Sequence, residues 1–107
     1  MTASDPGATT PPLVLDVDLE HRIVGVSGEL GEVTAPMLTS AGMHILSLGP
    51  GDLTLDFGGV TFISSPGLNA VVELRIALHE RHEELRLLNL SAQVKRVFVA
   101  GGLAALL

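Results

Sequence analysis

Residues 55–68, LDFGGVTFISSPGL, decide the fold of this 107-residue chain. Apolar and polar residues alternate before position 58, which is typical of a strand with one buried face. The glycines at 58–59 predict a turn, and the VTFI that follows predicts a short extension rich in β-branched residues. A helix comes next, because Ser65 is a candidate N-cap and Pro66 suits the first helical position. A strand that leads directly into a helix is typical of an α/β fold.

Strands and helices also alternate in the sequence before and after this stretch. Period-2 patterns predict strands, and apolar residues at helical spacing predict helices between them. The predicted strands are residues 13–19, 22–28, 53–57 with the extension 60–63, and 85–90, and the predicted helices are 34–48, 65–82 and 91–100. The order is β-β-α-β-α-β-α, with a hairpin first. We therefore expect an α/β domain with a mixed, mostly parallel sheet of four to five strands packed with three or more helices.

Composition limits the classes of function. Residues 1–11 are mostly Thr, Ser, Pro and Gly and predict a disordered tail, which leaves 12–107 as one domain. The net charge of −6 opposes binding to a phosphate backbone, and a 3% aromatic content opposes base stacking. The absence of cysteine excludes disulfides and thiolate zinc sites. The longest apolar run, residues 97–107, is too short for a membrane span, so we expect a cytoplasmic protein that binds neither nucleic acid nor membrane.

The sequence offers little support for catalysis. It lacks the glycine-rich nucleotide-binding motifs, the zinc-protease motif and the nucleophile elbow. His79 and His82 stand three residues apart beside Glu83, but two donors on a charged helix end are more typical of a solvated surface than of a metal site. A nucleotide-binding protein or an enzyme is therefore the least supported hypothesis, and we expect no catalytic residue, cofactor or metal.

The informative residues are Ser64 and Ser65, where a strand ends and a helix begins. Helix capping is the ordinary structural role for serine at such a position. The functional alternative is a phosphoacceptor, because the free N–H groups and positive dipole end of a helix tolerate a dianion. Phosphorylation there would change a contact surface while leaving the helix intact.

Three stretches of the chain together resemble a known family. They are VSGELGEVTAP at 26–36, LDFGGVTFISSPGL at 55–68 and LNLSAQVKRVFVAGGL at 88–103. In this order and spacing they are similar to the STAS domain of bacterial anti-sigma factor antagonists. The resemblance covers nearly everything from Leu13 onward.

The resemblance implies a switch in sigma-factor-dependent transcription. Such antagonists bind an anti-sigma factor that is also a serine kinase, and so release the sigma factor. The kinase phosphorylates the antagonist with ATP, the complex separates, and a phosphatase resets it. The acceptor position corresponds to Ser65, with Ser64 as the alternative, while Gly67 and Leu68 match the family motif and Pro66 replaces its second small residue.

Two departures keep a second hypothesis open. Ser64 and Gly31 stand where the family has aspartates, although Glu32 follows one residue later. A STAS binding module without phosphorylation, in a signalling scaffold or a transporter accessory complex, is the alternative. The predicted partner surface consists of Glu29, Gly31, Glu32, Thr34, Ser64, Ser65, Pro66, Gly67, Asn69 and Glu73. Arg75 falls within the apolar stripe of its helix, where it either reaches the edge with its charged end or marks a contact.

Overall fold

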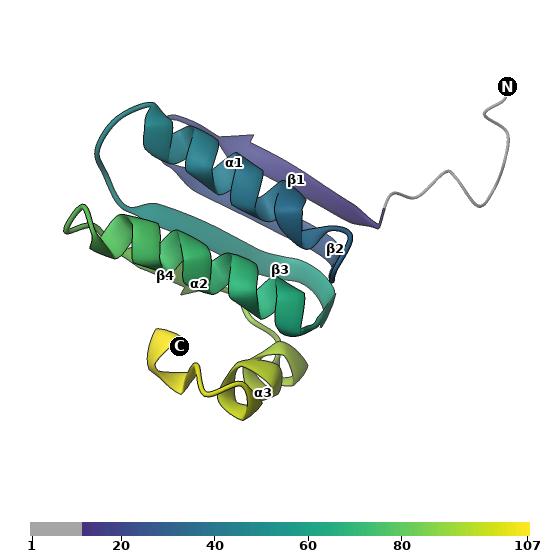
Figure 1. The fold of residues 1–107 in the computed structure, drawn as a ribbon. Coiled ribbons are helices and arrows are strands. Elements are labelled where there is room, and N and C mark those ends of the chain that lie inside the picture. The colour runs from purple at the N-terminus through teal and green to yellow at the C-terminus, as the bar shows by residue number, and fades with distance from the viewer. Residues whose placement is uncertain (1–11) are drawn as a thin grey trace, which may run out of the picture.

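The computed structural model describes residues 12–107, and it confirms the predicted class and order of elements (Figure 1). The elements are β1 (Leu13–Asp18), β2 (Ile23–Leu30), α1 (Ala35–Ser47), β3 (Leu53–Ile63), α2 (Ser65–His79), β4 (Leu85–Leu88), α3 (Ala92–Ala100) and a final 3₁₀ turn (Ala104–Leu106). The tail predicted for 1–11 lies outside the described residues. No helix within residues 12–107 is long and apolar enough to cross a bilayer.

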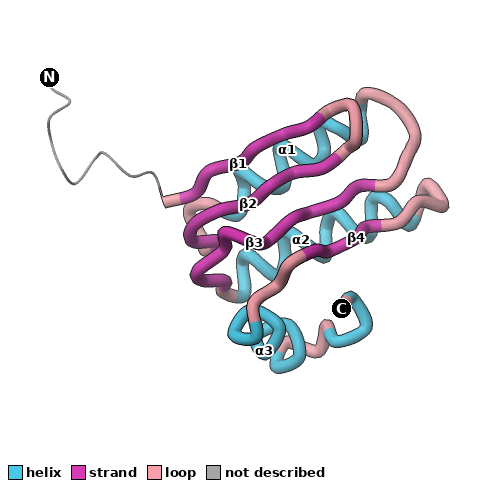
Figure 2. The backbone as a smooth tube through the Cα atoms, turned by 180° about the vertical axis from the view of Figure 1, so that it is seen from behind, coloured by secondary structure: helices cyan, strands magenta, loops and turns pink. Residues whose placement is uncertain are grey.

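The four strands of the described chain form one sheet in the order β1-β2-β3-β4. β1 is antiparallel to β2, and the other two pairs are parallel. Helices α1 and α2 are the crossovers of the parallel pairs, and both lie on the same face of the sheet (Figures 1 and 2). The outward positions of the opposite face include Asp16, Ser27 and Thr54. The same face, which α1 and α2 leave uncovered, also carries the exposed apolar side chains of Val14 and Leu88, so it is mixed in polarity.

The core between the sheet and the helices is almost entirely aliphatic, as the composition predicts. Its two aromatic rings, Phe57 of β3 and Phe98 of α3, meet edge to face with centroids 6.2 Å apart. α1 and α2 approach closely at Gly42, where an added Cβ would lie 2.5 Å from Leu74 Cδ2. This approach packs the two helices side by side as one layer.

The turn predicted at 58–59 is wrong, because β3 continues through both glycines to Ile63. The pairing of β3 with β2 shifts register twice in this region, which is the behaviour of β-bulges. A Cβ on Gly59 would lie 2.2 Å from the Oγ of Ser27, its partner on β2. The glycines therefore allow two strands to approach and do not reverse the chain.

The predicted cap of α2 is wrong by one residue, whereas the predicted cap of α3 agrees with the structure. α2 begins at Ser65 with Ser64 as its N-cap and Pro66 inside the first turn, so the predicted cap is one residue late. The Ser64 side chain makes no capping hydrogen bond. For α3 the sequence predicts Ser91 as the cap, and the structure confirms it, because the Ser91 side chain accepts a 3.1 Å hydrogen bond from the Val94 N–H.

Element ends and helix faces show further differences. α2 ends at His79, and His82 already has a left-handed φ of 59°. Met37 and Leu48 of α1 and Ile76 of α2 recur with other apolar residues at helical spacing, which predicts that they are buried, but they are about half exposed. The reason is that α1 and α2 each bury only the side that faces the sheet and the neighbouring helix.

Arginines hold together the end of the fold where α1 and α2 finish. We call this region the arginine end; it comprises Arg22, residues 45–52 and residues 81–86. The guanidinium groups of Arg22 and Arg81 donate hydrogen bonds of 2.7–3.4 Å to backbone carbonyls. The accepting residues are Ile45, Leu46, Gly49, Gly51 and Asp52. Glu83 completes the network by pairing with Arg81 at 3.0 Å and by accepting from the Gly51 N–H.

Candidate functional site

The predicted site residues gather at the opposite end of the sheet. β2 and β3 are parallel and pair through Leu30 and Ile63, so both strands finish at the same edge. The chain therefore leaves β2 at Gly31 beside the point where it leaves β3 at Ser64. The Ser64 N–H donates a 3.1 Å hydrogen bond to the Leu30 carbonyl, which joins the two exits. We call residues 29–34 and 62–69 the serine end.

The two serines differ in accessibility. Ser64 is half-buried, and a Cβ added to Gly31 would lie 3.6 Å from its Oγ. Ser65 is exposed and is the first residue of α2, where the backbone N–H groups are free and the helix dipole is positive. Ser65 is therefore the more accessible of the two hydroxyls.

Two of the predicted contact residues lie below the surface and shape the serine end. The buried Thr34 hydroxyl donates to the Glu29 carbonyl at 2.7 Å and accepts from the Gly31 N–H at 2.9 Å. Gly67 is also buried, and a Cβ on it would lie 2.4 Å from the Leu30 carbonyl oxygen. Thr34 thus braces the turn before α1, while Gly67 lets α2 start directly against β2.

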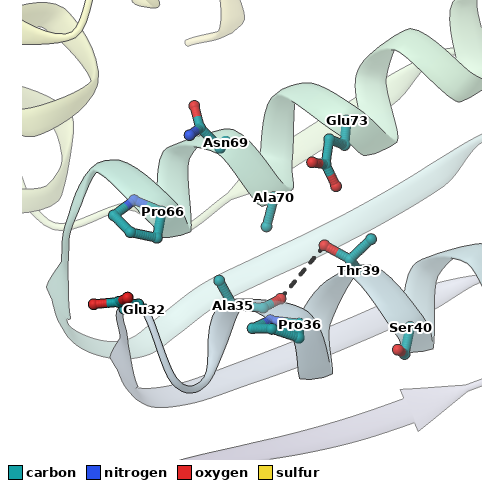
Figure 3. Close-up of a pocket in the computed structure, with 9 residues that line it drawn as sticks. All are labelled: Glu32, Ala35, Pro36, Thr39, Ser40, Pro66, Asn69, Ala70 and Glu73. Carbon is teal, nitrogen blue, oxygen red and sulfur yellow. Dashed lines mark hydrogen bonds between the residues drawn. The ribbon is translucent and has the colours of Figure 1, made fainter.

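A hollow of about 380 Å³ lies between the first halves of α1 and α2 (Figure 3). Four predicted contact residues line it: Glu32, Pro66, Asn69 and Glu73. The remaining lining residues are Ala35, Pro36, Thr39, Ser40 and Ala70. The sequence analysis missed the contribution of α1, although Pro36, Thr39 and Ser40 form an uncharged stripe at helical spacing that could have indicated it.

A second hollow on the serine end is more apolar. It lies over the turn between β2 and α1, where Val33 is 85% exposed and Phe62 is 50% exposed. Glu29 and Glu32 also line this hollow. Neither residues 29–44 nor residues 60–74 contain a lysine or arginine. The serine end therefore offers apolar side chains and carboxylates without a neighbouring basic side chain from these segments.

The histidine pair considered as a metal site does not form one. His82 lies beyond the end of α2, and no group of three or more possible metal-binding side chains occurs in residues 12–107. Arg75 is exposed and lines a hollow with His79 and the C-terminal turn, so it does not enter the core. None of these side chains adds to the serine end.

The exposed serine at the start of α2, beside a hollow formed by α1 and α2, thus belongs to a small α/β domain. Comparison with known proteins identifies the family of this domain. The family model described as "Mlab, STAS domain" matches residues 13–107, and the chain therefore belongs to the STAS domain family.

Similar proteins include regulators of sigma factors. The chain is 32% identical over 88 residues to the anti-sigma-B factor antagonist of Listeria monocytogenes, a match that covers 81% of this chain and 76% of that protein. The same identity and coverage apply to the anti-sigma-B factor antagonist of Listeria innocua.

Solved structures share the fold at lower identity. The anti-sigma factor antagonist SpoIIAA in its unphosphorylated form has a TM-score of 0.71 at 21% identity, covering 88% of this chain and 84% of that chain. An anti-sigma factor antagonist from Mycobacterium paratuberculosis has a TM-score of 0.71 at 24% identity, with coverage of 87% and 79%. The murine Solute Carrier 26 family member A9 anion transporter has a TM-score of 0.66 at 23% identity, covering 75% of this chain and 13% of the transporter.

Proposed function

We propose that this protein is a cytoplasmic anti-sigma factor antagonist whose serine end binds an anti-sigma factor of the serine-kinase type. Binding frees a sigma factor for transcription, and phosphorylation of Ser65 ends the interaction until a phosphatase removes the phosphate. One observation carries this proposal: an exposed serine begins α2 beside a two-helix hollow in a chain 32% identical to anti-sigma-B factor antagonists.

The surroundings of Ser65 suit a switch. A phosphoryl group adds about −1.5 to −2 charges, which the start of α2 accepts without unfolding. Glu32 and Glu73 line the adjacent hollow, and none of the residues that line it carries a basic side chain that could neutralise the phosphate. The dianion therefore stays hydrated, and removing it from water at a contact surface is costly. The bulk and hydration of the phosphate oppose docking while the fold remains unchanged.

A specific observation favours a second candidate function. Gly31 and Ser64, the two positions at which the family resemblance places aspartates, lie close together, because a Cβ added to Gly31 would lie 3.6 Å from Ser64 Oγ. The departures from the family pattern therefore remove both carboxylates from one spot beside the acceptor. This supports a STAS binding module that works without phosphorylation, in a signalling scaffold or a transporter accessory complex.

Phosphorylation in vitro distinguishes the two candidates. The purified chain is incubated with ATP and each serine-kinase-type anti-sigma factor of the source genome, and phosphate is mapped by mass spectrometry. Our proposal expects phosphate on Ser65, lost in Ser65→Ala and retained in the matched Ser64→Ala variant. A stable complex without phosphate on either serine supports the second candidate. Failure of every such anti-sigma factor to bind overturns the first.

The paired substitution Gly31→Asp with Ser64→Asp restores both family carboxylates and sharpens the test. If their loss has weakened presentation to the kinase, the double variant is phosphorylated faster at Ser65 than the wild type. Equal rates would show that the acidic pair is not needed in this chain.

A further inference from the structure

The hollow beside Ser65 is the first half of a longer groove between α1 and α2. Another hollow, of about 350 Å³ and distinct from the apolar one over the turn between β2 and α1, lies farther along the same two helices. It is lined by Met43, Leu46, Ser47, Ala77, Glu80 and Arg81. The α1 stripe that lines the first hollow continues through Met43 to Ser47, and the α2 stripe continues from Glu73 to Ala77 and Glu80. Because successive members of one stripe line both hollows, the two hollows lie in line.

The groove has the dimensions of a helix. From Pro36 to Ser47 the α1 wall spans twelve residues, whose eleven steps of about 1.5 Å give a length of about 17 Å. α1 and α2 run side by side in the same direction, because each returns the chain between parallel strands (Figure 1). A partner helix of about twelve residues is long enough to lie along the whole groove.

The two walls differ in chemistry. The α1 wall is uncharged, and its Met43 side chain is 45% exposed, a flexible apolar group of the kind that binding surfaces often use. The α2 wall carries Glu73 and Glu80, which are two turns apart and belong to no ion pair within residues 12–107. Arg81 is already bonded to Glu83 and to two carbonyls. The groove is thus uncharged on one side, where Met43 is exposed, and acidic on the other.

We propose that this groove binds an amphipathic basic helix of the protein partner. Its apolar side packs over Met43 and Ala77, and lysines or arginines about seven residues apart face Glu73 and Glu80. Helices recognised in grooves present their contacts at such spacings. The inference rests on the proposed function in placing the partner at the helix pair, and it extends the contact beyond the serine end.

Nuclear magnetic resonance with a synthetic helix tests the groove directly. The probe is a peptide of about 18 residues, with leucines on one face and two lysines seven residues apart on its flank; a scrambled peptide of equal composition is the control. We expect amide shifts along both hollows, including Met43 and Ala77, with the first peptide alone. Glu73→Lys with Glu80→Lys weakens binding by about tenfold or more, while the exposed Glu20→Lys changes it by less than about twofold. Shifts elsewhere on the surface, or equal binding of the scrambled peptide, overturn the inference.

Met43→Glu separates this inference from the proposed function. In the variant, the kinase-type anti-sigma factor that binds the wild type is expected to bind about tenfold more weakly, while the circular dichroism melt is unchanged because Met43 is partly exposed. If that factor binds Met43→Glu as well as wild type and still phosphorylates Ser65, the groove inference fails and the proposed function stands. If peptide shifts follow the groove but no anti-sigma factor binds, the groove stands and the proposed function fails.

Discussion

The two ends of the helix layer differ in the charged side chains that lie beside the helix termini. At the arginine end, Arg22 and Arg81 donate hydrogen bonds to carbonyls of the last turn of α1 and of the chain that follows it. At the serine end, the first N–H groups of α1 bond to the Gly31 and Thr34 carbonyls, Ser65 is exposed at the start of α2, and the nearby charged side chains are carboxylates on the surface. Cations thus complement the negative dipole end of α1, while the first turn of α2 carries no acidic side chain to complement its positive end.

Because of this difference, charged side chains at one end of the domain mainly hold the fold together, while side chains at the other end stay accessible. The arginine end uses its charged side chains for internal bonds, so they are not free for a partner. At the serine end, the internal side-chain bonds come from the buried Thr34, and Ser65, Glu32 and Phe62 remain accessible. Loss of a charged side chain that is bonded internally at the arginine end should therefore cost more stability than loss of an accessible side chain at the serine end.

The largest effect is expected for Arg81→Ala at the arginine end. The change removes hydrogen bonds to the Leu46 and Gly49 carbonyls and leaves Glu83, whose side chain is only 10% exposed, without its cation. Breaking a largely buried pair in this way lowers the free energy of unfolding by about 3 kcal/mol, as measured by urea denaturation. The control is Arg86→Ala, because the pairs of Arg86 with Asp52 and Glu84 are exposed and contribute less than about 1 kcal/mol. Equal losses in the two variants would remove the distinction between the ends.

A smaller effect is expected for Gly67→Ala at the serine end. The added Cβ would lie 2.4 Å from the Leu30 carbonyl oxygen, so α2 must move away from β2. Overpacking of this kind lowers the free energy of unfolding by about 2 kcal/mol. Gly31→Ala is the matched control, since its Cβ would lie 3.6 Å from Ser64 Oγ and change stability by less than about 0.5 kcal/mol. If chemical denaturation finds both variants as stable as wild type, close packing at this end is not required.

The same charge placed at the two ends tests the dipole argument. Ser65→Asp puts a carboxylate at the start of α2 and stabilises the fold by about 0.5 kcal/mol, whereas Ser47→Asp at the end of α1 destabilises it by a similar amount. Urea denaturation at low salt measures both changes, and high salt should reduce them through screening. Changes of the same sign at low salt would contradict the argument.

The smallest expected effect is a pH dependence at the arginine end. The Glu84 N–H, and then Arg86, hydrogen-bond to the Asp52 carboxylate and hold its pKa below the usual range. A lowered pKa in the folded state stabilises the fold above the unfolded-state pKa of about 3.9. This contribution is lost as the pH falls through the folded-state value. Asp52→Asn keeps the acceptor for Glu84 but does not titrate, so the stability difference from wild type should shrink in acid. A difference that is constant with pH would exclude this role for Asp52.

The fold could be predicted largely because its local patterns agree with one another. Alternation, helical spacing and the cap at Ser91 all indicate the observed order of elements. The glycines at 58–59 misled the prediction because the same pair suits a turn or a bulge. Only the approach of Ser27 on the neighbouring strand distinguishes the two.

The candidate site was predicted in part. The sequence placed Ser65 and Pro66 at a helix start, which the structure shows within one residue. It assigned Thr34 to the contact surface, whereas the hydroxyl is buried in bonds to the turn before α1. It also missed the wall of the groove formed by Pro36 and Ser40, because that wall exists only where α1 packs beside α2.

By itself, the sequence determined the aliphatic core, the order of strands and helices, a serine at the start of α2 and two long segments without basic residues. These properties depend on neighbours a few residues apart, which periodicity and capping describe. Only the tertiary structure decided that Gly31 touches Ser64, that Ser65 is the accessible hydroxyl and that two helices enclose a groove. Those contacts join residues about thirty positions apart through the parallel crossovers. Such contacts depend on which strands pair and which helix faces pack together, and the local sequence does not directly indicate these long-range contacts.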